Sequence, residues 1–186
     1  MQGKLQPGDR APDFTLPTVD GRQVKLADVL PRHDAVVVTF ICNHCPYVKA
    51  YIPRLIELQR EFADHVQFLA IGSNDAQAHP DDSFDNMKVM ARQWGLNFAY
   101  LRDEDQSVAR AYGAGRTPEI FVLDRQGVCR YEGGIDDNYQ DAAAVKERPL
   151  HDALAALTQG KAVAQPQTYA IGCTIKWKAG AAHDRA

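Results

Sequence analysis

The chain has 186 residues, of which 45% are hydrophobic and 24% charged, and its formal net charge is −3. This length and composition predict a single globular domain with one substantial core. Acidic and basic residues are interspersed, so neither a nucleic acid nor a membrane surface is expected as a partner. No apolar run approaches the ~20 residues of a membrane-spanning helix and the N-terminus has no apolar leader, so we expect a soluble cytoplasmic protein.

The first third of the chain contains a predicted hairpin, a buried strand and a long helix. Phe14–Leu16 and Val24–Leu26 flank an Asp-Gly turn, which predicts the hairpin. Val36–Ile41 is apolar at every position except Thr39 and is mostly β-branched, as in a central strand covered by helices on both faces. After Pro46, apolar residues recur at helical spacing, with a proline inside the helix that should kink it.

Strands and helices then alternate along the rest of the chain. We expect strands at 66–71 and 98–101, helices near 83–94 and 106–112, an antiparallel strand pair at 119–123 and 128–131, and a helix near 150–157. This order predicts an α/β fold with a central mixed β-sheet flanked by helices, an N-terminal hairpin and a C-terminal extension. We expect the domain to cover residues 1–160 and the extension, residues 161–186, to pack on it.

Four cysteines lie at positions 42, 45, 129 and 173. They are too few and too unevenly spaced for the disulfide framework of a small secreted domain. In a reducing compartment the close pair Cys42 and Cys45 therefore indicates redox cycling or metal binding.

Four segments carry a family resemblance. They are residues 7–14, the strand that runs into Cys45-Pro46, the stretch 103–113, and Thr117-Pro118 followed by Phe-Val-Leu-Asp. Together and in this order, they resemble the thioredoxin-like superfamily, on the branch of the peroxiredoxins (the alkyl hydroperoxide reductase/thiol-specific antioxidant group) and the TlpA-type thiol-disulfide oxidoreductases. The resemblance covers about residues 5–158. It implies a thioredoxin-like fold and a redox-active centre, and it implies no cofactor.

Cys45 is the predicted nucleophile, although a first reading of Cys-x-x-Cys would choose Cys42. TlpA-type proteins have a Phe shortly before Cys-Pro-x-Cys and a proline eight residues after its first cysteine, and Phe40 and Pro53 take these places around Cys45. The resemblance therefore places Val48 where the second cysteine normally lies. Proline also favours the first helical position, so Cys45 is predicted to be the N-cap residue, where free N–H groups and the helix dipole favour a thiolate.

Neighbouring residues are predicted to complete the site. Cys42 would receive the mixed disulfide or sulfenic acid formed on Cys45 and close an internal disulfide. His44 would either stabilise the adjacent thiolate or be simply solvated. The resemblance places the family's substrate-facing cis-proline at Pro118, which would hold the Thr117 backbone open for pairing with a bound chain.

Two departures from the peroxiredoxin pattern separate the alternatives. Cys42 replaces the activating Thr or Ser, and the expected arginine position holds Pro118. Arg116 is either a nearby substitute or an ordinary loop arginine. Cys173 is either a third redox cysteine that folds back across the site or a small buried apolar residue, and Cys129 is predicted to be structural.

No metal is predicted. Cys42, His44 and Cys45 offer three ligands within four residues, but a zinc site also needs a compact second pair, and the other two cysteines have no Cys or His beside them. The acidic residues after residue 73 are interpreted as a solvated rim and a helix N-cap: Asp75, Asp81, Asp82 and Asp85.

We therefore expect a thiol-disulfide oxidoreductase in which Cys45 attacks and Cys42 resolves. Its partners would be protein or small-molecule disulfides and a thiol reductant. The alternatives are a peroxiredoxin-like peroxidase with antioxidant activity, which reduces hydroperoxides and is recycled through Cys42 or Cys173, and a non-catalytic thioredoxin-like binding module. The sequence leaves the oligomeric state open.

Overall fold

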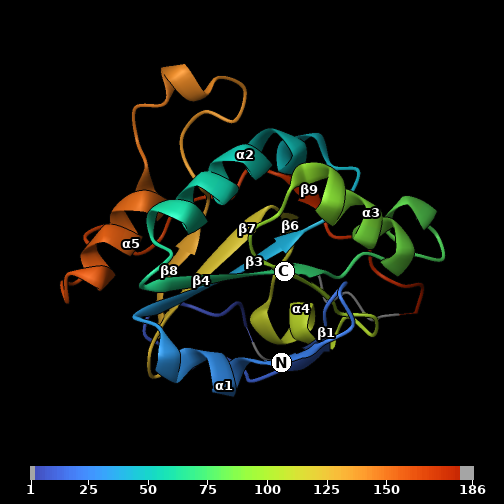
Figure 1. The fold of residues 1–186 in the computed structure, drawn as a ribbon, viewed down its shortest axis with the longest axis horizontal. Helices are drawn as coiled ribbons and strands as arrows, with labels where there is room; N and C mark the ends of the chain where they lie inside the picture. Colours follow the sequence, from blue (N-terminus) through green and yellow to red (C-terminus); the bar gives the residue numbers. More distant parts are fainter. Residues whose placement is uncertain (1–2, 181–186) are drawn as a thin grey trace.

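A five-stranded mixed sheet forms the centre of the computed structural model, which describes residues 3–180 (Figure 1). The strand order is β5-β4-β3-β7-β8. β4 is parallel to β3 and β5, and β7 is antiparallel to β3 and β8. The strands are β3 (Ala35–Ile41), β4 (Val66–Gly72), β5 (Ala99–Arg102), β7 (Glu119–Asp124) and β8 (Cys129–Gly133).

Helices cover both faces of this sheet (Figure 1). Residues of α2, α3 and α5 share one apolar cluster with the sheet, and residues of α1 and α4 share the other. The helices are α1 (Leu26–Val29), α2 (Pro46–Glu61), α3 (Phe84–Trp94), α4 (Ser107–Tyr112) and α5 (Pro149–Thr158), with short 3-10 turns at Leu30–Arg32, Pro80–Asp82 and Ala142–Ala144.

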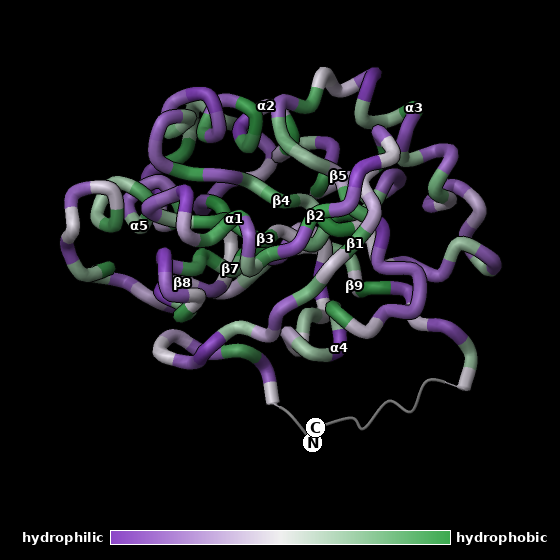
Figure 2. Tube along the Cα trace, turned by 60° about the horizontal axis from the view of Figure 1, so that its bottom comes forward, coloured by the Kyte–Doolittle hydropathy of each residue, from purple (hydrophilic) through white to green (hydrophobic). Residues whose placement is uncertain are grey.

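β3 is the middle strand of the sheet, and all seven of its residues are buried. Because successive side chains point to opposite faces, Val37 and Ile41 enter the cluster under α2, whereas Val36 and Phe40 enter the cluster above α1 and α4. Figure 2 shows the hydrophobic residues concentrated on the inner strands and the hydrophilic residues on the outer loops. The buried strand β3 thus fixes the position of its C-terminal end, and Cys42 and Cys45 follow directly after it.

Two small sheets lie beside the central one. The predicted hairpin is present as β1 (Thr15–Pro17) paired antiparallel with β2 (Gln23–Lys25). The second small sheet pairs β6 (Arg116–Thr117) antiparallel with β9 (Cys173–Thr174), which belongs to the segment after α5 (Figure 1).

The predicted central elements are confirmed with bounds that differ by one or two residues. β9 was not expected, nor was α1, which begins at the residue where the second strand of the hairpin was predicted to end. None of the described helices is long and apolar enough to cross a membrane.

Candidate active site

Cys45 is the N-cap residue of α2, as predicted, with Pro46 at the first helical position. Its backbone is extended, with φ −68° and ψ 124°, which is the usual conformation of an N-cap residue. The side chain has 0% relative exposure and lies in the core cluster that also contains Val48. The N-cap position, where the helix dipole favours a thiolate most, therefore holds a buried sulfur atom.

The surroundings of Cys45 favour its thiolate. The hydrogen bond from the Cys42 thiol lowers the pKa of Cys45 most, burial opposes this effect, and the thiol and backbone N–H of Cys173 and the backbone N–H of Val48 lower the pKa further. The sulfur makes no cap hydrogen bond of ordinary geometry, so the amide of Val48 acts as a nearby dipole. The net result is a pKa well below that of a free cysteine.

Three of the four cysteines meet at this helix end, and all four are free thiols. Sγ of Cys45 lies 2.9 Å from Sγ of Cys173 and 3.3 Å from the carbonyl oxygen of Thr117. Sγ of Cys42 lies 3.4 Å from Oγ1 of Thr117. The structure thus brings together the predicted pair and the more distant candidate in the tail.

The two other thiols of this cluster hold their protons. The hydrogen bond to Cys45 and burial raise the pKa of Cys42, and the charge of Asp82 raises it further. Burial and then the hydrogen bond to Cys45 raise the pKa of Cys173 to about 11. Protonated Cys42 and Cys173 therefore both donate toward a thiolate on Cys45. The distant Cys129 is fully buried, and burial raises its pKa to about 12.

The peptide bond between Thr117 and Pro118 is cis, as the resemblance implied. The backbone of Thr117 pairs with Cys173 of the chain's own tail. Gly172 makes this close approach possible, because a Cβ atom there would lie 2.3 Å from the carbonyl oxygen of Thr117. Arg116 binds the same segment, since its Nη1 donates to the carbonyl oxygen of Gly172 at 3.1 Å.

His44 contacts Asp82, with Nδ1 2.8 Å from Oδ2, in a geometry that is not aligned as a hydrogen bond. The interpretation of Asp75 and Asp82 as parts of a solvated rim is wrong, because these residues are 6% and 3% exposed. Asp82 uses both of its carboxylate oxygens. Oδ1 accepts from the backbone N–H of Asn43 and Oδ2 from the amide of Asn74, both at 2.8 Å. Asp82 therefore fixes the loop that carries the two cysteines.

Cys42, His44 and Asp82 each offer one metal-ligand atom, and these atoms lie within 4.8 Å of one another. However, both oxygens of Asp82 already accept hydrogen bonds from amides, which a metal would have to displace. The donor set fits a hydrogen-bonded network better than a metal site.

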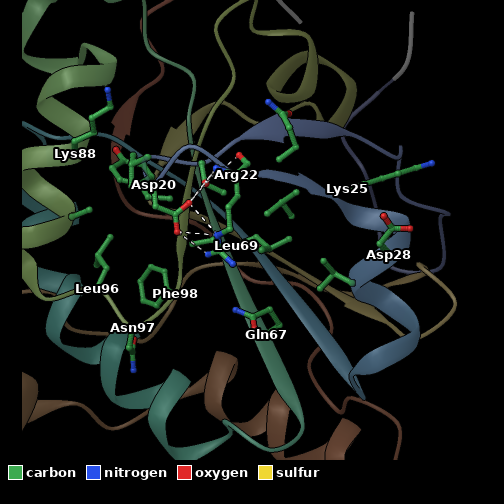
Figure 3. Close-up of a pocket in the computed structure, with 18 of the residues that line it drawn as sticks. Asp20, Arg22, Lys25, Asp28, Gln67, Leu69, Lys88, Leu96, Asn97 and Phe98 are labelled. Carbon is green, nitrogen blue, oxygen red and sulfur yellow. Dashed lines mark hydrogen bonds and ion pairs between the residues drawn. The ribbon is translucent and has the colours of Figure 1, made fainter.

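A surface hollow of about 1110 Å³ lies elsewhere, between the β1–β2 hairpin, α3 and β5 (Figure 3). The ion pair of Asp20 and Arg22 and the side chains of Gln67 and Phe98 line it. No cysteine lines this hollow, so it carries none of the thiol chemistry.

The profile of the AhpC/TSA family matches residues 7–132. The chain belongs to this family. A Mycobacterium tuberculosis protein, named provisionally as a peroxiredoxin, is 33% identical over 136 residues, which are 73% of this chain and 81% of that protein. The thiol-disulfide oxidoreductase ResA of Geobacillus thermodenitrificans is 29% identical over 121 residues, or 64% of each chain.

A crystal structure of an uncharacterized conserved protein from Geobacillus kaustophilus matches with a TM-score of 0.89 and 43% identity over 95% of both chains. This match includes most of the segment after α5, which the family profile lacks. Thioredoxin-like proteins are also among the structural neighbours of this AhpC/TSA member, so the predicted thioredoxin-like fold is confirmed.

Proposed function

We propose that this AhpC/TSA member is a thiol-disulfide oxidoreductase in which Cys45 is the nucleophile and Cys42 the resolving cysteine. The observation that carries the proposal is the position of Cys45 as the N-cap residue of α2, where the thiol of Cys42 is the first cause of its lowered pKa. The thiolate is the form of cysteine that attacks a disulfide. A second thiol in contact with it can complete the exchange.

The reaction has two exchange steps. The Cys45 thiolate attacks one sulfur of the substrate disulfide, forming a mixed disulfide and releasing the other substrate sulfur as a thiolate that takes up a proton. Cys42 then loses its proton and attacks Sγ of Cys45. This closes the Cys42–Cys45 disulfide and releases the second substrate thiol. The substrate gains two electrons and two protons, which an external thiol reductant must return to the protein.

Thr117 is the proposed contact for the substrate backbone. Its carbonyl oxygen lies 3.3 Å from Sγ of Cys45, and its backbone is paired with an extended segment in the present state. An extended chain with a disulfide would fit this edge, because main-chain pairing gives affinity without requiring a particular sequence. We therefore propose protein disulfides as substrates alongside small disulfides. His44 is not proposed to act on the substrate, since it faces Asp82.

The test is the reduction of insulin disulfides with dithiothreitol as the electron donor. Cys45→Ser should lower the rate by roughly 100-fold or more, because a serine hydroxyl is not ionised at neutral pH. In a Cys173→Ser background, which removes the other thiol in contact with Cys45, Cys42→Ser should accumulate a mixed disulfide between Cys45 and substrate, detected by mass. Cys129→Ala removes a buried thiol outside the cluster and is the matched control, with activity unchanged. Equal rates for all three variants would favour a non-catalytic binding module.

A thiol peroxidase is the second candidate function, because the tail leaves Cys45 with 0% relative exposure and a hydroperoxide is much smaller than a protein disulfide. Against it, Arg116 binds the tail carbonyl of Gly172 and the position of the activating Thr or Ser holds Cys42. Stopped-flow mixing of the reduced protein with hydrogen peroxide separates the two functions. An oxidoreductase should lose thiols no faster than free cysteine, whereas a peroxidase should lose them orders of magnitude faster.

A further inference from the structure

The segment Ala170–Lys176, here called the tail strand, occupies the edge where a substrate chain would lie. It pairs antiparallel with β6, with Cys173 opposite Thr117. The backbone N–H of Ile175 also donates to the carbonyl oxygen of Gly115 at 3.0 Å. The tail strand thus makes the main-chain contacts by which an extended peptide adds to a sheet edge.

Side chains and further backbone contacts anchor the tail strand at both ends. Ala170 and Ile175 are buried, with relative exposures of 4% and 3%. The backbone of Lys176 accepts from the N–H of Asp75 and donates to Oδ1 of Asn74. Docking is therefore a property of the whole segment and holds Cys173 in place.

Exposure differs among the three clustered thiols. Cys45 and Cys42 have 0% and 2% relative exposure, whereas Cys173 is of intermediate exposure. With the tail strand docked, an external thiol therefore meets Cys173 first. The 2.9 Å separation of Sγ of Cys173 from Sγ of Cys45 brings these two sulfur atoms into direct contact.

We propose that the tail strand is a tethered substrate strand and that Cys173 is a third redox cysteine, which transfers the disulfide of the buried Cys42–Cys45 pair to the surface. The proposal rests on the proposed function, because that reaction forms the Cys42–Cys45 disulfide. It also defines the substrate class: an extended polypeptide with a cysteine opposite Thr117 and a small residue before it, at the place of Gly172.

The transfer is a thiol-disulfide exchange with no net change in oxidation state. The Cys173 thiolate attacks Sγ of Cys45, the bond between Cys45 and Cys173 forms, and the bond between Cys45 and Cys42 breaks. Cys42 leaves as a thiolate and takes up the proton that Cys173 lost. An external dithiol then attacks Sγ of Cys173 and releases the Cys45 thiolate. The second thiol of the donor frees Cys173, so the donor is oxidised to a disulfide and the protein gains two electrons.

The first experiment maps disulfides in Cys42→Ser after oxidation with one equivalent of diamide. Non-reducing peptide mass spectrometry should find Cys45 linked to Cys173 in most molecules. The double variant Cys42→Ser/Cys173→Ser is the control and should leave Cys45 alkylatable. If Cys45 of the single variant remains free, or links only between two molecules, the proposal is overturned.

The second experiment follows the reduction of the preformed Cys42–Cys45 disulfide by dithiothreitol. Cys173→Ser should slow this step by about tenfold or more, because the donor loses its accessible sulfur. An unchanged or faster rate would mean that the tail strand only covers the site. Circular dichroism checks that the variant keeps its fold. A single-turnover reaction of reduced Cys173→Ser with insulin tests the proposed function separately. If neither the wild type nor this variant reduces insulin, the proposed oxidoreductase function is wrong, whatever disulfides the mass spectrometry finds.

A glycine pair tests the docking of the tail strand. Gly172→Ala places a Cβ atom 2.3 Å from the carbonyl oxygen of Thr117 and should displace the strand. Iodoacetamide should then label Cys45 at least about tenfold faster than in the wild type, since exposure limits thiol reactivity. Gly3→Ala is the matched control, because a Cβ atom there meets nothing within 4 Å and the residue makes no contact used by the tail strand. Equal labelling of Cys45 in the two variants would contradict the proposed docking.

Discussion

Asp82→Ala should destabilise the protein strongly, although sequence patterns place this residue in a polar loop. Its carboxylate accepts hydrogen bonds from the backbone N–H of Asn43 and the side-chain amide of Asn74, both at 2.8 Å. All three residues are buried, with relative exposures of 3%, 4% and 2%. Alanine would therefore leave two buried donors without their acceptor.

The magnitude follows from the cost of unsatisfied buried groups. A buried donor that loses its acceptor costs about 1–3 kcal/mol, so two such donors give about 2–6 kcal/mol for Asp82→Ala. In a domain of this size, 1 kcal/mol changes the Tm by about 2–4 °C, so the expected loss in Tm is on the order of 10 °C. Asp82→Asn keeps one carbonyl oxygen as an acceptor and should lie between alanine and the wild type.

Urea unfolding of the reduced protein, followed by tryptophan fluorescence, measures this loss in the free energy of unfolding. Asp85→Ala is the matched control, because its side chain is 92% exposed and its ion pair is with Lys88 in the same helix turn. That change should stay within about 0.5 kcal/mol of the wild type. A free energy for Asp82→Ala equally close to the wild type would refute the view that this carboxylate fixes the cysteine loop.

Two further predictions follow from the charged groups. Alkylation of Cys45 should continue at pH values below the usual thiol pKa of about 8.5 and should stop only as the pH falls through the lowered pKa of Cys45. Burial raises the pKa of Cys129, so this thiol should stay unlabelled in the folded protein. Equal labelling of the two cysteines would contradict this prediction. Lys4→Met should cost about 3 kcal/mol in urea unfolding, because it leaves the buried carboxylates of Glu119 and Glu132 without their cation, and a loss below 0.5 kcal/mol would count against the pairing. Because the pKa of Lys4 is raised in the folded protein, this stabilisation is fully present at pH values below the ordinary lysine pKa. It is lost as the pH rises through the raised pKa of Lys4.

Local patterns were sufficient to predict the central elements and the position of Cys45 at the start of α2. The unbroken apolar run that became β3 is visible without any partner strand, and Pro46 alone marks Cys45 as the N-cap residue. Both signals act within a few residues, so a single sequence carries them. The family resemblance supplied the cis bond before Pro118, which local preferences do not favour.

Long-range contacts explain what the sequence did not reveal. β9 has only two residues and pairs with the equally short β6, so neither has a periodic pattern of its own. Asp82 looks like any acid before a helix, and its role depends on Asn43, which lies far back in the chain. The sequence suggested two roles for Cys173, but only the folded tail strand brings its sulfur to Cys45.

The docked tail strand has two opposite effects on Cys45, and a single variant should separate them. The thiol and backbone N–H of Cys173 help to lower the pKa of Cys45, while the same segment leaves the sulfur buried. Displacing the strand with Gly172→Ala should therefore make labelling faster at high pH and also move the pH midpoint of labelling upward. The midpoint should stay below that of free cysteine, because the hydrogen bond from Cys42 and the amide of Val48 remain. Faster labelling with an unchanged midpoint would show that the tail strand only restricts access. A midpoint at the value of free cysteine would show that Cys173, and not the helix end, is the main cause of the lowered pKa.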